Sequence, residues 1–352
     1  MGKKRRSNKK SSKNKKSNSA SSSDGKLKIS VLTVSQLKRI PFIHNLSRMI
    51  EHQKNVEIYE WVITNGCVTD EDHDKFNEEI KKVSCKIPIK LVASKDLAYR
   101  NIGAFRNLAN KNSSGDIVVC MDDDDYYFKD YVKSCVDVLS KKKNFELVGC
   151  SGMFMYDYGF DTVFRLASFG ANHTVNCCMA YRREYHLNHK YDETRKTGEE
   201  MSFLNDYKSK MFQLPPTSAL IHMSYADNTF SEKRLNQLNA MSNYVRAPDR
   251  TPLIYSPMSS SLKSIIKDDK IYDCYMETFK SINSQKETDV IFYYGNLEDY
   301  WNPNDNDLNV VRRRCLDIGR ELIKKGFTVS VYGKFKENEL TKEGIIFYNL
   351  KF

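Results

Sequence analysis

The feature that most constrains the fold of this chain is an alternation of apolar, β-branched segments with helical patterns. Residues 28–35, 58–64 and 87–93 each have the near-continuous apolar composition of a buried strand. A helix is expected over residues 102–110 and a fourth strand over 116–121. Because buried strands that alternate with helices pair in parallel and are covered on both sides, the sequence predicts an α/β domain. Its sheet should be mostly parallel, with helices on both faces.

Later segments extend this pattern less regularly. We expect a helix over residues 130–141, a strand over 146–150, a β-hairpin within 153–169 and a helix over 199–210. A buried strand without redox chemistry is the simplest account of residues 177–181, which begin with two adjacent cysteines. These elements predict one large first domain.

Composition and prolines divide the chain into four segments. Residues 1–26 form a basic tail, and residues 27–245 form the main domain. Prolines interrupt residues 246–287, which we interpret as a linker or helical connection. Residues 288–352 restart an α/β pattern. A segment this short either docks on the main domain or opens a longer one.

The basic charge of the chain lies mainly at its N-terminus. Residues 1–25 hold nine Lys or Arg and one Asp, so +8 of the net charge of +11 lies there and +3 elsewhere. We expect this Ser/Asn-rich tail to be disordered and to contact RNA or anionic surfaces, or to act only as a solubilising extension. No apolar run is long enough to span a bilayer, and no signal-peptide core is present. The expected location is therefore cytoplasmic, in the host cytoplasm if the chain is viral.

Four consecutive aspartates follow the fourth expected strand. Asp122, Asp123, Asp124 and Asp125 bring four formal negative charges to the strand end, where open α/β sheets bind ligands. Such a charge favours a divalent cation, and Mg²⁺ or Mn²⁺ binds carboxylate oxygens together with substrate phosphates. The alternative is a solvated acidic turn at the start of the next helix. The sequence thus indicates a Mn²⁺ or Mg²⁺ site with a nucleotide diphosphate as co-ligand.

Motifs between residues 28 and 230 resemble the family 2 glycosyltransferases. Residues 29–39 are similar to the first-strand motif of that family, and residues 60–67 resemble its Trp-Ile-Ile-Val-Asp-Asp-Gly-Ser motif. Asn65 replaces an aspartate that contacts the nucleobase in the family, so the choice of base stays open. Residues 103–122 resemble a Gly-x-x-x-Arg-Asn stretch that leads into the Asp-x-Asp motif. The resemblance implies a GT-A fold, which is Rossmann-like, and a sugar-nucleotide donor.

The same resemblance assigns roles to residues of this chain. Asp122 would lie near the ribose and Asp124 would bind the metal that bridges the two phosphates, with Asp125 or Asp123 as alternatives. Arg106 would steady the nucleotide or its pyrophosphate, the alternative being an ordinary surface salt bridge. The residues assigned to the nucleotide sugar are Thr33, Ser35, Asn65, Arg106, Asn107, Asp122 and Asp123.

Two further motifs concern the acceptor side of the site. Glu200 lies in a segment that resembles the Gly-Glu-Asp motif of the family, whose second acid is the catalytic base, and Glu199 is the alternative. Both glutamates also suit the start of a helix. His222 lies in a segment that resembles a His-rich turn of the family, where it would meet metal or phosphate, although a lone histidine is more often structural.

The C-terminal segment carries a second resemblance. Residues 290–295 and 325–333 look like the first β-α-β unit of a GT-B glycosyltransferase. The usual donor-binding half of such an enzyme is absent, so we expect only a partial module there. The pairing of two transferase modules also resembles giant-virus enzymes.

The sequence predicts a metal-dependent glycosyltransferase of the hexosyltransferase type. A UDP-sugar is the expected donor and a glycan or protein hydroxyl the acceptor, and the resemblance implies inversion at the anomeric carbon. One alternative is a nucleotidyltransferase, which should show a Gly-rich triphosphate loop near the first strand. The other is a nucleic-acid-binding or scaffold protein with a degenerate transferase domain, which would bind through its basic tail.

Overall fold

The structure is a computed structural model. It describes residues 26–97, 100–225, 228, 255–284, 290–293, 316–322, 329–333, 339–342 and 345–349. Residues 1–25, which hold the basic charge of the predicted tail, lie outside the described residues.

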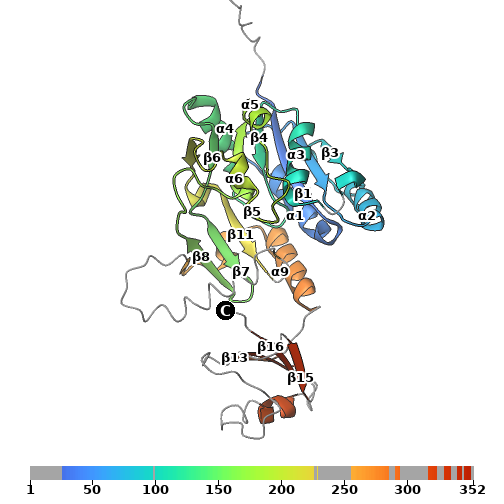
Figure 1. Ribbon diagram of the computed structural model, residues 1–352. Helices are drawn as coiled ribbons and strands as arrows, with labels where there is room; N and C mark the ends of the chain where they lie inside the picture. The colour runs from blue at the N-terminus through green and yellow to red at the C-terminus, as the bar shows by residue number, and fades with distance from the viewer. Residues whose placement is uncertain are drawn as a thin grey trace, which may run out of the picture.

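A seven-stranded sheet forms the centre of the first domain (Figure 1). Its strand order is β10-β6-β9-β4-β1-β2-β3, and only β9 runs antiparallel to its neighbours. The sheet therefore has the mostly parallel character expected from its apolar strands. The bounds are Ile29–Ser35 (β1), Glu60–Asn65 (β2), Ile89–Val92 (β3), Ile117–Cys120 (β4), Leu147–Gly149 (β6), Ala180–Arg182 (β9) and Met211–Gln213 (β10).

Helices cover both faces of this sheet, because successive residues of its central strands point to opposite layers. Val31 and Val119 pack with α1, α2 and α4, whereas Leu32 and Val118 pack with α3, α5 and α6. The predicted α/β fold class is confirmed. The helix bounds are Ile40–Glu51 (α1), Asp70–Lys81 (α2), Ile102–Asn112 (α3), Tyr131–Lys141 (α4), Arg183–Asn188 (α5) and Glu200–Phe203 (α6).

A second sheet, of order β12-β8-β7-β11-β5, continues from the end of β4. Its strands β7 and β8 form the hairpin predicted within residues 153–169. Strand β5 directly follows the four aspartates and pairs antiparallel with β11, with Tyr126 opposite Ile221. This pairing brings the chain around residue 222 to the acidic turn. The bounds are Tyr126–Tyr127 (β5), Phe154–Asp157 (β7), Thr162–Leu166 (β8), Leu220–Ser224 (β11) and Tyr255–Pro257 (β12).

The predicted linker or helical connection contains two helices, α8 (Leu262–Ile265) and α9 (Asp269–Ser284). Figure 1 shows α9, in orange, below α1. The Asn45 side chain of α1 donates a hydrogen bond to the Ile271 carbonyl at 3.2 Å. Tyr275 and Phe279 are fully buried in the same hydrophobic core as α1. Helix α9 is therefore packed into the core that supports the first sheet.

Two of the local predictions are wrong. The helix expected over residues 199–210 is only α6, because Asn205, Asp206 and Tyr207 have φ values of 52°, 50° and 61°. Left-handed backbone cannot continue an α-helix, and it turns the chain toward β10. The strand expected over 177–181 begins only at β9, since residues 176–178 form a short 3-10 helix, Asn176–Cys178 (η3).

The C-terminal segment forms a four-stranded sheet of order β13-β14-β16-β15. Only β15 is antiparallel, and a helix over residues 316–322 contributes the buried Leu316. A restarted α/β pattern is therefore present. The bounds are Val290–Tyr293 (β13), Val329–Gly333 (β14), Glu339–Lys342 (β15) and Ile345–Asn349 (β16). Within the described residues, every helix is too short or too polar to cross a bilayer.

Candidate active site

The acidic turn begins where β4 leaves the centre of the sheet. Thr33 of β1 fixes the start of this turn, because its hydroxyl donates to the Met121 carbonyl at 2.7 Å and accepts from Trp61 Nε1 at 2.9 Å. Asp123, Asp124 and Asp125 are buried, whereas the side chain of Asp122 retains 27% exposure. The four carboxylates are therefore not a solvated surface turn.

Arg106 joins the acidic turn to the segment that was predicted to carry the base. Its guanidinium lies 3.2 Å from Asp122 Oδ1, and its Nε donates to Glu199 Oε1 at 3.0 Å. Burial alone would lower the pKa of Arg106, but Asp122 and Glu199 raise it above its ordinary value. Burial raises the pKa of Asp122, and Arg106 opposes that rise. Because Arg106 is buried between two carboxylates, it is not an ordinary surface salt bridge.

Arg39 is a site residue that the sequence analysis did not single out. Its guanidinium donates to Asp123 Oδ1 at 2.9 Å and to Asp124 Oδ2 at 2.7 Å. The Ser35 hydroxyl donates to the other oxygen of Asp123 at 2.5 Å. Burial raises the pKa of Asp123 to about 7, against the opposing effect of Arg39. The available signal was a lone arginine just beyond the first strand, at the sheet edge where the acids lie.

Asp124 also accepts hydrogen bonds from residues just beyond β11. The Tyr225 hydroxyl donates to Asp124 Oδ2 at 2.8 Å, and the Asn228 amide donates to the same oxygen at 3.2 Å. Asn228 also accepts the backbone N–H of Tyr225 at 2.7 Å. Both residues lie in the segment that resembles the His-rich turn, but their contact with Asp124 was not predicted, because it depends on the second sheet.

His222 and Cys177 lie beside Asp125. His222 Nδ1 is 2.8 Å from Asp125 Oδ1, which also accepts the backbone N–H of Met223 at 3.0 Å. Burial would raise the pKa of Asp125, but His222 and these hydrogen bonds hold it below its ordinary value. The possible ligand atoms of Asp125, Cys177 and His222 all lie within 4.8 Å of one another. Among the described residues, this is the one group of three such side chains close enough to share a metal ion.

Asn65 and Asn107 use their amides to fix the surrounding backbone. Asn65 donates to the His73 carbonyl at 3.0 Å and accepts the backbone N–H of Cys67 at 2.9 Å. Asn107 donates to the Tyr191 carbonyl at 2.9 Å and accepts the backbone N–H of the same residue at 3.0 Å. The predicted contacts of both side chains with a nucleotide sugar stay predictions.

The two glutamates of the predicted base motif have different environments. Glu199 is buried and paired with Arg106. Glu200 begins α6 and is partly buried. Burial, followed by the charge of Glu199, raises the pKa of Glu200 above its ordinary value. Arg106 thus fixes the Glu199 carboxylate in a buried ion pair, but it does not fix the Glu200 carboxylate in the same way.

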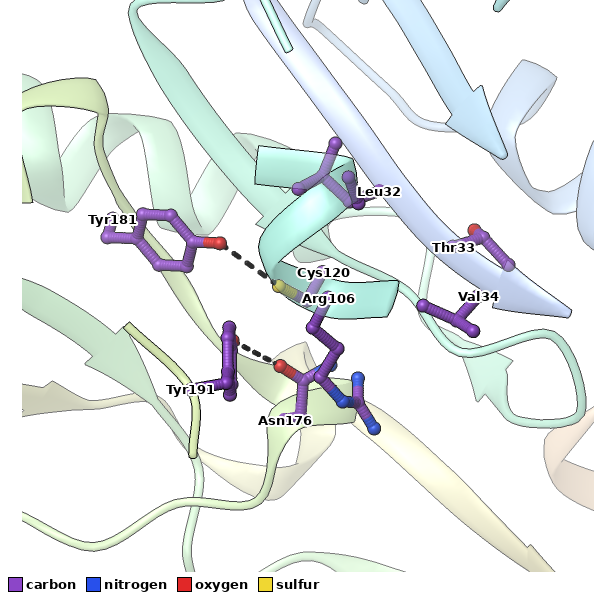
Figure 2. A pocket seen from close by; sticks show the side chains of 9 residues that line it. Leu32, Thr33, Val34, Arg106, Cys120, Asn176, Tyr181 and Tyr191 are labelled. Carbon is purple, nitrogen blue, oxygen red and sulfur yellow. Dashed lines mark hydrogen bonds between the residues drawn. The ribbon is translucent and has the colours of Figure 1, made fainter. Parts of the chain in front are cut away.

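A small cavity of about 10 Å³ lies between Thr33 and Arg106 (Figure 2). Its wall includes Asn176, whose carboxamide oxygen accepts a hydrogen bond from the Tyr191 hydroxyl at 2.5 Å. The cavity can hold about one water molecule. In this conformation the cavity itself is too small for a sugar nucleotide.

Residues 42–201 match the model of the family described as Glycosyl transferase family 2. The matched segment contains Asn65, Arg106, the four aspartates and Glu199 and Glu200, whereas Arg39 and His222 lie outside it. The mostly parallel α/β architecture agrees with the predicted GT-A fold. The GT-B resemblance of residues 288–352 and the resemblance to giant-virus enzymes stay predictions.

Several solved structures are similar to this chain. S. aureus TarS 1-349 in complex with UDP-GlcNAc has 16% identity and a TM-score of 0.46, over 72% of this chain and 73% of that chain. The mannosyltransferase PcManGT from Pyrobaculum calidifontis, with GDP-Man and Mn²⁺, has 11% identity and a TM-score of 0.44, over 86% and 81%. Glucosyl-3-phosphoglycerate synthase from Mycobacterium tuberculosis, with Mn²⁺, UDP and glucosyl-3-phosphoglycerate, has 14% identity and a TM-score of 0.37, over 67% and 88%. No curated protein sequence matches the chain.

Proposed function

Because residues 42–201 match the model of Glycosyl transferase family 2, we propose that this chain is a glycosyltransferase that uses a nucleotide-diphosphate sugar and a divalent cation. The sugar passes to an acceptor hydroxyl with inversion at the anomeric carbon. The inversion rests on the motif resemblance. A UDP-sugar as donor and a glycan or protein as acceptor belong to the same proposal.

The charge balance of the acid cluster is the observation that carries this proposal. Among the described residues, four carboxylates, those of Asp122, Asp123, Asp124 and Glu199, share two guanidinium groups, Arg39 and Arg106. Asp125, the fifth carboxylate, is paired with His222. With all five carboxylates ionised and His222 left out of the count, the formal charge of this largely buried cluster is −3. Uncompensated buried charge is costly. A divalent cation would offset most of it and would also favour the binding of a diphosphate.

The donor atoms around Asp125 fit such a cation. Carboxylate oxygens and imidazole nitrogens both bind Mn²⁺, and Asp125 and His222 are already adjacent. Asp124, the metal ligand favoured by the sequence analysis, shares its Oδ2 with Arg39, which would first have to move. The carboxylate of Asp122 is the most exposed of the four aspartates. A side chain that contacts a ribose must be accessible in this way. When bound, the cation would stabilise negative charge on the departing diphosphate.

Glu200 is the residue that we assign as the base. An inverting displacement needs a carboxylate that takes the proton from the acceptor hydroxyl. Glu199 forms a buried ion pair with Arg106. Among the described residues, Glu200 forms no such ion pair with an arginine, and its pKa is raised. A raised pKa brings a carboxylate closer to the working pH and makes it a better proton acceptor. Glu199 then serves to hold Arg106 against Asp122.

Thermal unfolding of the full chain with UDP-, GDP- and CMP-sugars, with and without Mn²⁺, tests the proposal. We expect one class of sugar nucleotide to raise the melting temperature only when Mn²⁺ is present. Asp125→Asn should abolish that shift. Asp137→Asn should retain it, because Asp137 is a partly exposed acid on α4 that pairs with two lysines. If no sugar nucleotide gives a Mn²⁺-dependent shift in the unmutated chain, the proposed function is wrong.

The remaining sequence-based assignments also belong to the proposal. They include the cytoplasmic location and the contact of the basic tail with RNA or anionic surfaces. No specific observation in the described part of the chain favours the nucleotidyltransferase or the scaffold protein over the transferase.

A further inference from the structure

We propose that Asp125, Cys177 and His222 form a binding site for a divalent cation of the zinc class. The three side chains come from distant parts of the chain, namely the turn after β4, the short helix η3 and strand β11. The claim that such an ion binds stands on these residues alone. The claim that it competes with Mn²⁺ or Mg²⁺ rests on the proposed function.

The geometry of the three side chains is close to that of a metal site. Each can offer one ligand atom, and these atoms lie within 4.8 Å of one another. The shortest pair is His222 Nδ1 and Asp125 Oδ1 at 2.8 Å. Ligand atoms bound to one tetrahedral ion at about 2.0–2.3 Å lie roughly 3–4 Å apart. Small side-chain movements are therefore enough to bring all three atoms to the same ion.

The backbone that carries two of these ligands is held by buried tyrosines. The Tyr127 hydroxyl donates to the Cys177 carbonyl at 2.9 Å, and the Tyr275 hydroxyl donates to the Asp125 carbonyl at 2.7 Å. Both tyrosine side chains are fully buried. His222 is fixed differently, through the pairing of β11 with β5 and β7. The site is thus built on rigid elements, and little conformational entropy is lost when an ion binds.

The other acids of the cluster are less suited to this ion. Asp123 and Asp124 are bonded to Arg39, and Asp122 is bonded to Arg106. A guanidinium stays protonated and cannot become a ligand, so an ion must displace it. An imidazole and a thiol can each lose a proton and then bind the metal directly. Asp125 is therefore the acid whose neighbours can join it as ligands.

The donor set decides which class of ion is preferred. One sulfur, one nitrogen and one oxygen are the ligand types of zinc sites, and cobalt binds the same ligands. Mg²⁺ prefers an octahedral shell of oxygens, and a thiol adds nothing to its binding. The side chain of His222 is 23% exposed, whereas Asp125 and Cys177 are buried. Solvent thus reaches this group at the imidazole, and an ion held there would exclude Mn²⁺ from Asp125 and His222.

Cobalt binding to the metal-free full chain tests the proposal, because Co²⁺ reports its ligands by its absorption spectrum. We expect one Co²⁺ per chain with the intense visible bands of tetrahedral coordination and a sulfur-to-metal charge-transfer band. Zn²⁺ should displace it. Cys177→Ser should remove the charge-transfer band and weaken Zn²⁺ binding at least about tenfold. Cys85→Ser, a change at a half-buried cysteine outside this group, should leave both unchanged.

Two controls keep the result interpretable. Circular dichroism and thermal unfolding in the presence of a chelator establish that each variant is folded, and His222→Gln provides a second variant at a partly exposed position. His222→Gln should also weaken Zn²⁺ binding and change the visible bands. A spectrum typical of octahedral Co²⁺, or one that neither Cys177→Ser nor His222→Gln alters, overturns the proposal.

The experiment also separates this inference from the proposed function. It contains no sugar nucleotide, so a chain that binds Zn²⁺ through Cys177 but transfers no sugar contradicts only the transferase mechanism. Conversely, if the chain binds the sugar nucleotide in a Mn²⁺-dependent way but its Co²⁺ spectrum shows no thiolate ligand, only the proposal of a zinc-class site is contradicted.

Discussion

Arg106 Nε donates to Glu199 Oε1 at 3.0 Å, although the two residues are 93 positions apart in the sequence. Because of this hydrogen bond, we assign the two neighbouring glutamates different roles: Glu199 holds Arg106, and Glu200 is the proposed base. Glu199→Gln should lower the free energy of unfolding by about 1–3 kcal/mol, because it removes a buried charged partner of Arg106. Glu200→Gln should leave stability nearly unchanged and abolish sugar transfer. Urea unfolding and a transfer assay on both variants check this, and equal stability losses would contradict the separation of roles.

Arg39 substitutes for part of the positive charge that the acid cluster requires. Arg39→Gln leaves Asp123 and Asp124 without their guanidinium and should destabilise the metal-free chain by about 3 kcal/mol. Mn²⁺ should then raise the melting temperature of this variant more than that of the unmutated chain, because a cation can take the place of the guanidinium. Lys133→Gln, at a partly exposed pair on α4, is the control. A smaller Mn²⁺ effect in Arg39→Gln would contradict this view.

The raised pKa of Asp123 predicts a pH dependence of stability. Its pKa lies at about 7 in the folded chain against 3.8 for an ordinary aspartate carboxyl, so the folded state binds the proton more tightly. The contribution of Asp123 to stability is therefore present below pH 3.8 and is lost as the pH rises toward 7. Urea unfolding of the metal-free chain between these pH values should show this fall. It should be reduced in Asp123→Asn and retained in Asp137→Asn.

Helix α9 should be essential for the stability of the first domain. Phe279→Ala should lower the free energy of unfolding by about 3–5 kcal/mol, because its ring is fully buried against Phe42 and Tyr225. Lys280→Ala, one residue further along and exposed, should change it by less than about 0.5 kcal/mol. Chemical denaturation of both variants is the measurement. If α9 were only a connector, the two variants would be equally stable.

The central sheet could be predicted from the sequence because its signals are local. The strands around Val31, Val62 and Val119 are apolar on both faces and are separated by helical patterns. The prediction of a helix over residues 199–210 was wrong for a reason that is also local. The helix ends at Phe203, and Asn205 and Asp206 adopt left-handed backbone, which these residue types tolerate. Sequence periodicity does not reveal that conformation.

The acid cluster was only partly predictable. Asp122 to Asp125 and Arg106 are marked by their places at a strand end and in the preceding helix. The contacts of Tyr225 with Asp124 and of Tyr275 with the Asp125 carbonyl span 101 and 150 positions. Cys177 reaches the site because η3 turns there. Contacts of this kind depend on how the two sheets and α9 pack together, so no single-sequence motif contains them.

Release of the nucleoside diphosphate from a sugar nucleotide tests the central claim most directly. With its preferred UDP- or GDP-sugar, the full chain should release the nucleotide only when a divalent cation is present. Glu200→Gln should reduce that rate at least about a hundredfold, and Glu184→Gln, at a carboxylate of α5 outside the site, should not. No release from any donor, or equal release by Glu200→Gln and the unmutated chain, would contradict the account.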